Sequence, residues 1–164
     1  MYEYLLETKP FDALELVGGL NREENQIQIS LWQEMRGRGI FVPITGSSDS
    51  HGTVNGEHFN RSKMLAFSES CSRDALLEAV REGRTAALEQ YAGEAIPRIY
   101  GLHRYVAFAQ FLLSDYFPLH DELCFEEGRL MKSYSSGDED ARGMLKILHG
   151  RCEKLLKKYW SRDG

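Results

Sequence analysis

One short polar segment, Gly46 to Gly52, contains residue types that can do chemistry. Within it, Asp49 and His51 are separated by a single serine. Where a backbone is extended, residues two apart project to the same side. Asp49 and His51 then offer a carboxylate oxygen and an imidazole nitrogen to one point, a donor pair that zinc, manganese or iron accepts. Asp49 and His51 are therefore candidate ligands, although an Asp-x-His pair alone is a weak motif that many surface loops contain by chance.

The elements around this segment place it at the end of a buried strand. An apolar stretch at 11–17 precedes a helix that Asn21 can cap, with Glu24 as the reciprocal partner. A second apolar stretch follows at 40–44. Strand, helix and strand with short connections favour a parallel pair, so the polar segment lies at the carboxyl end of its strand. Ligands bind at this edge in α/β folds.

The rest of the chain divides into a βα part and a helical part. Strands are predicted at 63–67 and 85–88, with a helix from Arg73 to Glu82 between them. Residues 93–164 then follow a helical pattern, and three apolar stripes predict three helices. The stripes are Ile99, Leu102, Val106, Ala109 and Leu113; Leu119, Leu123, Leu130, Met131 and Tyr134; and Leu145, Leu148, Cys152, Leu155, Leu156 and Tyr159. We predict residues 1–92 as the βα segment and the remainder as a helical extension.

The stretch from Phe11 to Gln90 resembles the carboxyl half of the polymerase and histidinol phosphatase (PHP) superfamily. The matching features are Asp12 to Leu16, Pro43 to His51, and the helix with its Gly-Arg end at Leu76 to Arg84. The resemblance implies an α/β fold, a partial βα barrel corresponding to the carboxyl half of a distorted barrel. In this family the barrel edge holds divalent metals that activate water against a phosphate ester. The resemblance carries the metal-ligand role over to the Asp-x-His pair.

The chain also departs from this family. No histidine precedes His51, so the opening His-x-His strand and the other ligands that the family places upstream are missing. Two ligands hold a metal loosely, because a catalytic zinc normally takes three from the protein. We therefore expect a divalent metal (zinc, manganese or iron) to bind weakly or not at all. The chain alone should be almost inactive.

If Met1 is an internal start, the upstream reading frame should encode the missing ligands. The complete protein is then a phosphoesterase acting on a small-molecule or nucleotide phosphate ester. The alternative is a non-catalytic structural module derived from the same fold. In either case a half-barrel leaves a sheet edge and apolar faces uncovered, which favours a homo-oligomer or a helical tail folded over them.

Other acidic and aromatic candidates have simpler interpretations. Glu15 is expected to be an exposed or paired strand residue, although it could face the same edge as the metal pair. Glu57 and His58 could complete a metal shell, but a solvated loop explains them better. Five aromatic residues of the helical part are expected in its core: Tyr100, Tyr105, Phe108, Phe111 and Tyr116.

The remaining histidines do not form a metal motif in the sequence. His120 and Cys124 have the i, i+4 spacing that can bind zinc, but no second pair lies nearby in the sequence. We therefore interpret this stretch as a helix start, with Asp121 favouring the dipole and Cys124 in the core. His103 and His149 are isolated and are expected to be packed or exposed histidines.

Composition excludes several classes of protein. The 164 residues are 42% hydrophobic and carry a formal net charge of −5, which argues against nucleic-acid binding. No apolar run is long enough to cross a membrane, and the amino terminus lacks the basic and apolar regions of a secretory signal. Three widely spaced cysteines predict reduced thiols and a cytoplasmic location.

Overall fold

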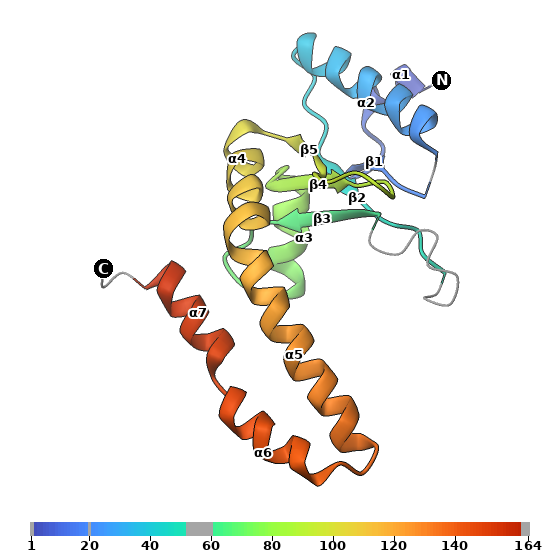
Figure 1. Cartoon of the computed structure of the whole chain (residues 1–164). Coiled ribbons are helices and arrows are strands. Elements are labelled where there is room, and N and C mark those ends of the chain that lie inside the picture. Colours follow the sequence, from blue (N-terminus) through green and yellow to red (C-terminus); the bar gives the residue numbers. More distant parts are fainter. Residues whose placement is uncertain (1, 20, 52–60, 162–164) are drawn as a thin grey trace. The chain divides into compact units, whose positions relative to one another are not determined.

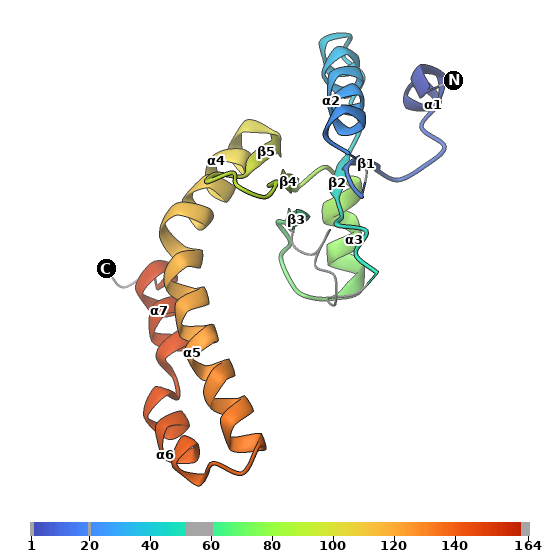
Figure 2. The same cartoon turned by 45° about the vertical axis from the view of Figure 1, so that its right-hand side comes forward.

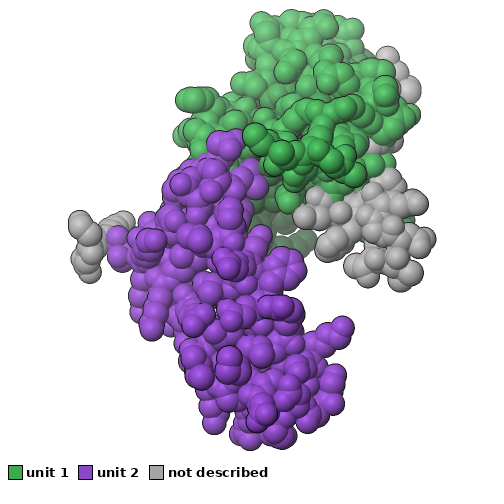
Figure 3. All heavy atoms as spheres, in the orientation of Figure 1, with its two compact units in different colours: residues 1–109 green, residues 110–164 purple. Residues whose placement is uncertain are grey.

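The computed structural model describes residues 2–19, 21–51 and 61–161. The chain forms two compact units, unit 1 at 1–109 and unit 2 at 110–164 (Figure 3). This division differs from the boundary at 92/93 that the composition suggested, because the residues just after 93 group with unit 1.

Unit 1 alternates helices and strands (Figure 1). Its elements are α1 (Tyr2–Thr8), β1 (Leu14–Val17), α2 (Arg22–Gly37), β2 (Ile44–Gly46), β3 (Ser62–Ala66), α3 (Arg73–Arg81), β4 (Thr85–Glu89), β5 (Arg98–Gly101) and α4 (His103–Phe111), which runs across the boundary. β1 and β2 pair in parallel, and β3, β4 and β5 form an antiparallel sheet. The predicted α/β class is confirmed. The described strands do not close into a barrel.

The parallel pair that the sequence predicts is present, but its second strand is shifted. β2 begins at Ile44, whereas the apolar pattern placed the strand at 40–44. Pro43 explains the shift, because proline has no N–H to donate to a ladder. Its carbonyl still accepts a hydrogen bond from Leu14 N at 2.9 Å.

Helix α2 has the predicted cap but a different buried face. The Asn21 side chain accepts from Glu24 N at 2.9 Å, and Glu24 Oε2 accepts from Asn21 N at 3.3 Å. The i, i+4, i+8 spacing of Ile27, Leu31 and Met35 predicts one buried stripe, but Ile27 is 68% exposed whereas Met35 is buried. The buried core of unit 1 consists of Leu6, Leu16, Val17, Ile29, Trp32, Met35, Val42, Ile44 and Ala87. Burying each leucine, isoleucine, valine or methionine side chain of this core stabilises the fold by about 1.5–3 kcal/mol.

Strand β5 replaces the predicted start of a helix. Ile99 fits a helical stripe in the sequence, yet it pairs with Leu88 in an antiparallel ladder. Gly101 allows this close approach, because a Cβ there would lie 2.9 Å from the Thr85 carbonyl oxygen. Long-range pairing therefore overrides the local periodicity.

Unit 2 consists of helices that fold back along one another (Figure 2). They are a π-helical turn (Leu112–Tyr116), α5 (Phe117–Ser135), α6 (Glu139–Leu148) and α7 (Arg151–Trp160). The single last helix predicted from the sequence is broken at Gly150, whose φ of +80° suits glycine. Pro118 lies in the first turn of α5, directly after the π-helical turn. No helix in these described segments combines the length and apolarity of a bilayer span.

The aromatic residues expected in the core are only partly buried. Tyr105 in unit 1 and Tyr116 in unit 2 are buried, as predicted, but Phe108 is 37% exposed. In unit 2, the Tyr116 ring meets Tyr159 and Trp160 with centroids 5.5 and 5.8 Å apart.

Candidate functional site

The carboxyl ends of β1, β2 and β4 meet at one edge of unit 1. Thr85, the first residue of β4, donates through its hydroxyl to the Ile44 carbonyl at 2.7 Å, so β4 and β2 begin side by side. At the other end, Glu89 pairs with Ser62. The Ser62 hydroxyl lies 3.5 Å from the Gly18 carbonyl, just after β1. We call this side, with Gly18–Gly19, residues 47–51 and Glu89, the carboxyl edge.

Asp49 and His51 lie together on the carboxyl edge. Asp49 Oδ1 is 3.5 Å from His51 Nε2, and the side chains are 67% and 89% exposed. The Asp49 side chain also lies against Gly19, where a Cβ would come within 2.7 Å of Oδ2. Both donors are therefore side by side and open to solvent.

The backbone brings this pair together differently from the extended geometry on which the prediction relied. β2 ends at Gly46, and Asp49 has a φ of +51°, in the left-handed region. Aspartate tolerates this region better than most residues, and such conformations concentrate at functional sites. A tight turn, not strand alternation, aims the carboxylate and the imidazole at one point. Their role as metal ligands stays a prediction.

A buried acidic network lies at the same edge. Glu89 is 3% exposed, and its Oε1 accepts a hydrogen bond from the Tyr100 hydroxyl at 2.8 Å. Its Oε2 lies 3.4 Å from Asn25 Nδ2, and Arg98 Nη1 lies 3.6 Å from Oε1. Asn25 also donates to the Tyr91 hydroxyl at 3.2 Å. Burial and the neighbouring Glu89 raise the pKa of Tyr100, so this tyrosine stays protonated as a donor.

The Gly18–Gly19 turn connects the network to the Asp-His pair. Gly18 N donates to Asn25 Oδ1 at 3.4 Å, and Arg61 Nη2 donates to the Gly18 carbonyl at 3.2 Å. The Arg61 and Arg22 guanidinium groups lie 5.5 and 5.2 Å from the Tyr91 ring centroid. Two cationic groups are thus held near the carboxyl edge by cation–π contacts.

Sequence reasoning missed the buried network. Glu89 follows the apolar run Thr85 to Leu88, and the predicted strand stopped before it. The signal available was its place at the end of a buried strand, where a carboxylate reaches the ligand-binding edge. Its partners come from distant parts of the chain, so no local pattern identifies them.

The other acidic candidates do not join the Asp-His pair. Glu15 is exposed, as expected, and its carboxyl group covers Gly18, with Cδ 2.9 Å from the position of a Cβ there. Glu57 and His58 lie outside the described residues. Among residues that are described, no group of three histidine, cysteine or acidic ligands includes Asp49 or His51.

An open pocket of about 460 Å³ lies on the α1–β1–α2 side of unit 1. Its lining is mostly apolar and consists of Leu6, Leu14, Glu15, Glu24, Ile27, Gln28 and Leu31. Its two carboxylates belong to Glu15, which lies over Gly18, and Glu24, which caps α2, so the carboxyl edge, where a carboxylate meets an imidazole, is the better candidate site.

The interpretation of His120 and Cys124 is corrected by the structure. No helix starts at His120. The helical conformation continues without a break from α4 through the π-helical turn into α5, which begins at Phe117. Cys124 is exposed and does not belong to a core. Cys152, from α7, lies near both residues. Burial and the adjacent Cys124 thiol raise the pKa of Cys152.

His103 and His149 are exposed, in agreement with their interpretation as isolated histidines.

Comparisons with family models, curated proteins and solved structures found no match to this chain. The resemblance to the PHP superfamily therefore rests on the residues themselves.

Proposed function

We propose that the chain supplies part of the metal-binding edge of a metal-dependent phosphoesterase of the PHP type. The observation that carries the proposal is the 3.5 Å separation of Asp49 Oδ1 and His51 Nε2 at the carboxyl edge. Two ligands held about 2.1 Å from a tetrahedral metal lie about 3.4 Å apart. In this proposal β1, β2 and β4 correspond to neighbouring strands of a partial βα barrel.

The side chains at the carboxyl edge have the roles that such a reaction requires. Asp49 and His51 hold a divalent cation, and both are exposed enough to bind it without rearrangement of the core. A metal bound there supplies Lewis-acid chemistry and lowers the pKa of bound water. Arg61 donates to the Gly18 carbonyl and adds positive charge near the Gly18–Gly19 turn, which favours an anionic phosphate ester, whereas Arg22 is paired with Glu94. The buried network around Glu89 keeps this edge rigid.

Two protein ligands alone give weak affinity for a divalent metal. The substrate class is a small-molecule or nucleotide phosphate ester. We expect the chain by itself to have almost no hydrolytic activity.

A second candidate function is a non-catalytic module that assembles with copies of itself. It is favoured by the apolar side chains that unit 2 exposes, such as Phe125 at 75% and Ile147 at 67%. Patches of this kind often mark protein–protein contacts.

A manganese titration tests the metal proposal. Mn²⁺ prefers oxygen and nitrogen donors, so thiols elsewhere in the chain interfere little. We expect weak saturable binding, followed by electron paramagnetic resonance, that is lost in Asp49→Ala and in His51→Ala. The matched control is Asp12→Ala, because Asp12 is an exposed aspartate of unit 1 that precedes β1 and pairs with Arg81.

Equal Mn²⁺ binding by all four proteins would overturn the assignment of Asp49 and His51. No binding by the unmodified chain would leave the self-assembly function, which light scattering checks through the oligomeric state. Hydrolysis of p-nitrophenyl phosphate with Mn²⁺ is expected to be near background.

A further inference from the structure

We infer that His120, Cys124 and Cys152 form a binding site for a zinc-class metal ion that fastens α7 to α5 within unit 2. This inference is independent of the proposed function, because its residues and its ligand chemistry differ from those of the carboxyl edge. Sequence spacing alone did not show the site, since Cys152 lies far from the other two residues in the chain.

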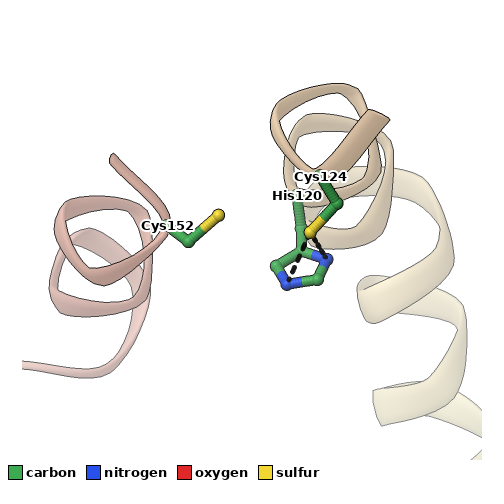
Figure 4. A group of neighbouring side chains, drawn as sticks. All are labelled: His120, Cys124 and Cys152. Carbon is green, nitrogen blue, oxygen red and sulfur yellow. Dashed lines mark hydrogen bonds between the residues drawn. The ribbon is translucent and has the colours of Figure 1, made fainter. Parts of the chain in front are cut away.

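The three donor atoms already lie close together. One ligand atom from each residue lies within 4.8 Å of the other two. His120 and Cys124 are one turn apart on α5, and Cys152 points toward them from α7 (Figure 4). Cys124 Sγ is 3.7 Å from His120 Nε2. A tetrahedral zinc places sulfur and nitrogen ligands about 3.6 Å apart, so only a small inward shift of Cys152 is required.

The donor set selects the metal. Two thiolates and one imidazole are soft to borderline ligands, which suit Zn²⁺, Co²⁺ and Cd²⁺ better than Mg²⁺ or Mn²⁺. Three protein ligands leave a fourth position for water. Cys124 is exposed, so an ion can reach the site from solvent.

The surroundings of His120 orient it for metal binding. His120 Nδ1 lies 3.2 Å from Asp121 Oδ1, and a donated Nδ1–H leaves Nε2 free as the metal ligand. The ring also stacks on Tyr116, with centroids 5.5 Å apart and planes at 27°. A carboxylate behind a metal-binding histidine is the usual arrangement in zinc sites. The stacking restricts rotation of the imidazole.

Unit 2 has only a small core, in which Tyr116, Ala141 and Leu148 are buried. Over their described lengths, neither α5 nor α7 buries a single side chain fully. Gly150, with no side-chain cap, is the joint between α6 and α7. Small units with little core depend on metals, disulfides or assembly for stability. A metal that bridges α5 and α7 stabilises the folded hairpin by the free energy of binding.

Cobalt and zinc titrations of the reduced full chain test the site. We expect one Co²⁺ per chain, with the thiolate-to-cobalt charge-transfer absorption that reports sulfur ligands. Zn²⁺ should displace the cobalt and raise the thermal unfolding midpoint of unit 2. Cys124→Ser and Cys152→Ser should each remove the absorption. Circular dichroism verifies that these conservative variants keep their helices.

Matched variants separate this site from other thiols and from the carboxyl edge. Cys71→Ser changes an exposed cysteine of unit 1 and should leave cobalt binding unchanged. Asp121→Asn should weaken zinc binding by about 10–100-fold, the usual effect of losing a carboxylate behind a histidine ligand. Asp49→Ala should leave cobalt binding at this site unchanged. The inference can therefore hold even if the proposed function of the carboxyl edge is wrong.

Two results would overturn the inference. One is a reduced chain that shows no thiolate–cobalt absorption. The other is an absorption that persists in Cys152→Ser, since this would show that α7 does not contribute a ligand. A disulfide between Cys124 and Cys152 could form in air. If the chain then bound no cobalt after reduction, this would also overturn the inference.

Discussion

The two units of this protein differ in how much apolar side chain each one buries in its own interior. In unit 1, Leu16 and Val17 of β1 and Met35 of α2 are 0% exposed and belong to one core cluster. In unit 2, α5 and α7 bury no side chain fully, and Phe125 is 75% exposed. A site in unit 1 can therefore be positioned by core packing. In unit 2, aromatic contacts and single polar contacts connect α7 to the π-helical turn and to α5, so a bound metal or a partner can add stability there.

The two candidate sites also differ in how their side chains are held in place. The carboxyl edge has a buried polar network that connects Glu89, Asn25 and Tyr100. At the His120 site, the ring stacks on Tyr116 and the Asp121 carboxylate lies beside it. We therefore expect the carboxyl edge to keep its geometry without metal, whereas the arrangement of α7 on α5 should depend on the ion.

The largest predicted effect is a loss of stability when a buried methionine of unit 1 is replaced, compared with an exposed methionine of unit 2. Met35→Ala removes a side chain at 0% exposure from the core of unit 1 and should cost about 2–5 kcal/mol in the free energy of unfolding. Met131→Ala removes a methionine side chain that is 54% exposed in unit 2, and it should change the free energy of unfolding by less than about 0.5 kcal/mol. Urea unfolding followed by circular dichroism measures both. A comparable loss at Met131 would show that a partner covers this surface and would break the comparison.

A smaller effect is predicted for the buried network. Tyr100→Phe removes the donor to the buried Glu89 carboxylate and should cost about 1.5–3 kcal/mol, the range for hydrogen bonds to charged groups. Tyr134→Phe, at a tyrosine that is 40% exposed in unit 2, should leave stability unchanged. Chemical denaturation of both variants at neutral pH gives the comparison. Equal stabilities would show that the network contributes nothing to unit 1.

The same tyrosine predicts a pH dependence. Burial raises the pKa of Tyr100 in the folded protein, so the unfolded chain loses this proton first. The contribution to stability is complete below the ordinary tyrosine pKa of about 10 and is lost as pH rises above it. Unfolding midpoints between pH 8 and pH 11 should fall less steeply in Tyr100→Phe than in the unmodified chain. Parallel curves would contradict the buried position of this hydroxyl.

The smallest effect concerns a helix end. Asn21→Ala removes the side chain that caps α2 and should cost about 1 kcal/mol, whereas Gln26→Ala on the exposed face of α2 should cost little. The loss should appear only in the unfolding transition of unit 1, because the cap is a local contact. An equal shift in the transition of unit 2 would show that the units unfold together, which would weaken the comparison.

Much of the local structure could be predicted from the sequence. The capping box of Asn21 and Glu24 and the parallel β1–β2 pair are both present. These features depend on contacts within a few residues or on one short crossover. The approach of Asp49 to His51 is produced by a turn that the extended spacing did not predict. The partial barrel and the metal-ligand roles stay predictions.

What the sequence by itself determined is therefore the set of local choices: where helices begin, which strands are parallel, and which short segment carries a carboxylate beside an imidazole. Tertiary structure alone decided that Glu89 is buried against Asn25 and Tyr100, and that Cys152 lies beside His120. The physical reason is distance along the chain. Hydrogen bonds and metal ligands between remote segments depend on how those segments pack, and packing leaves no periodic signal in any one of them.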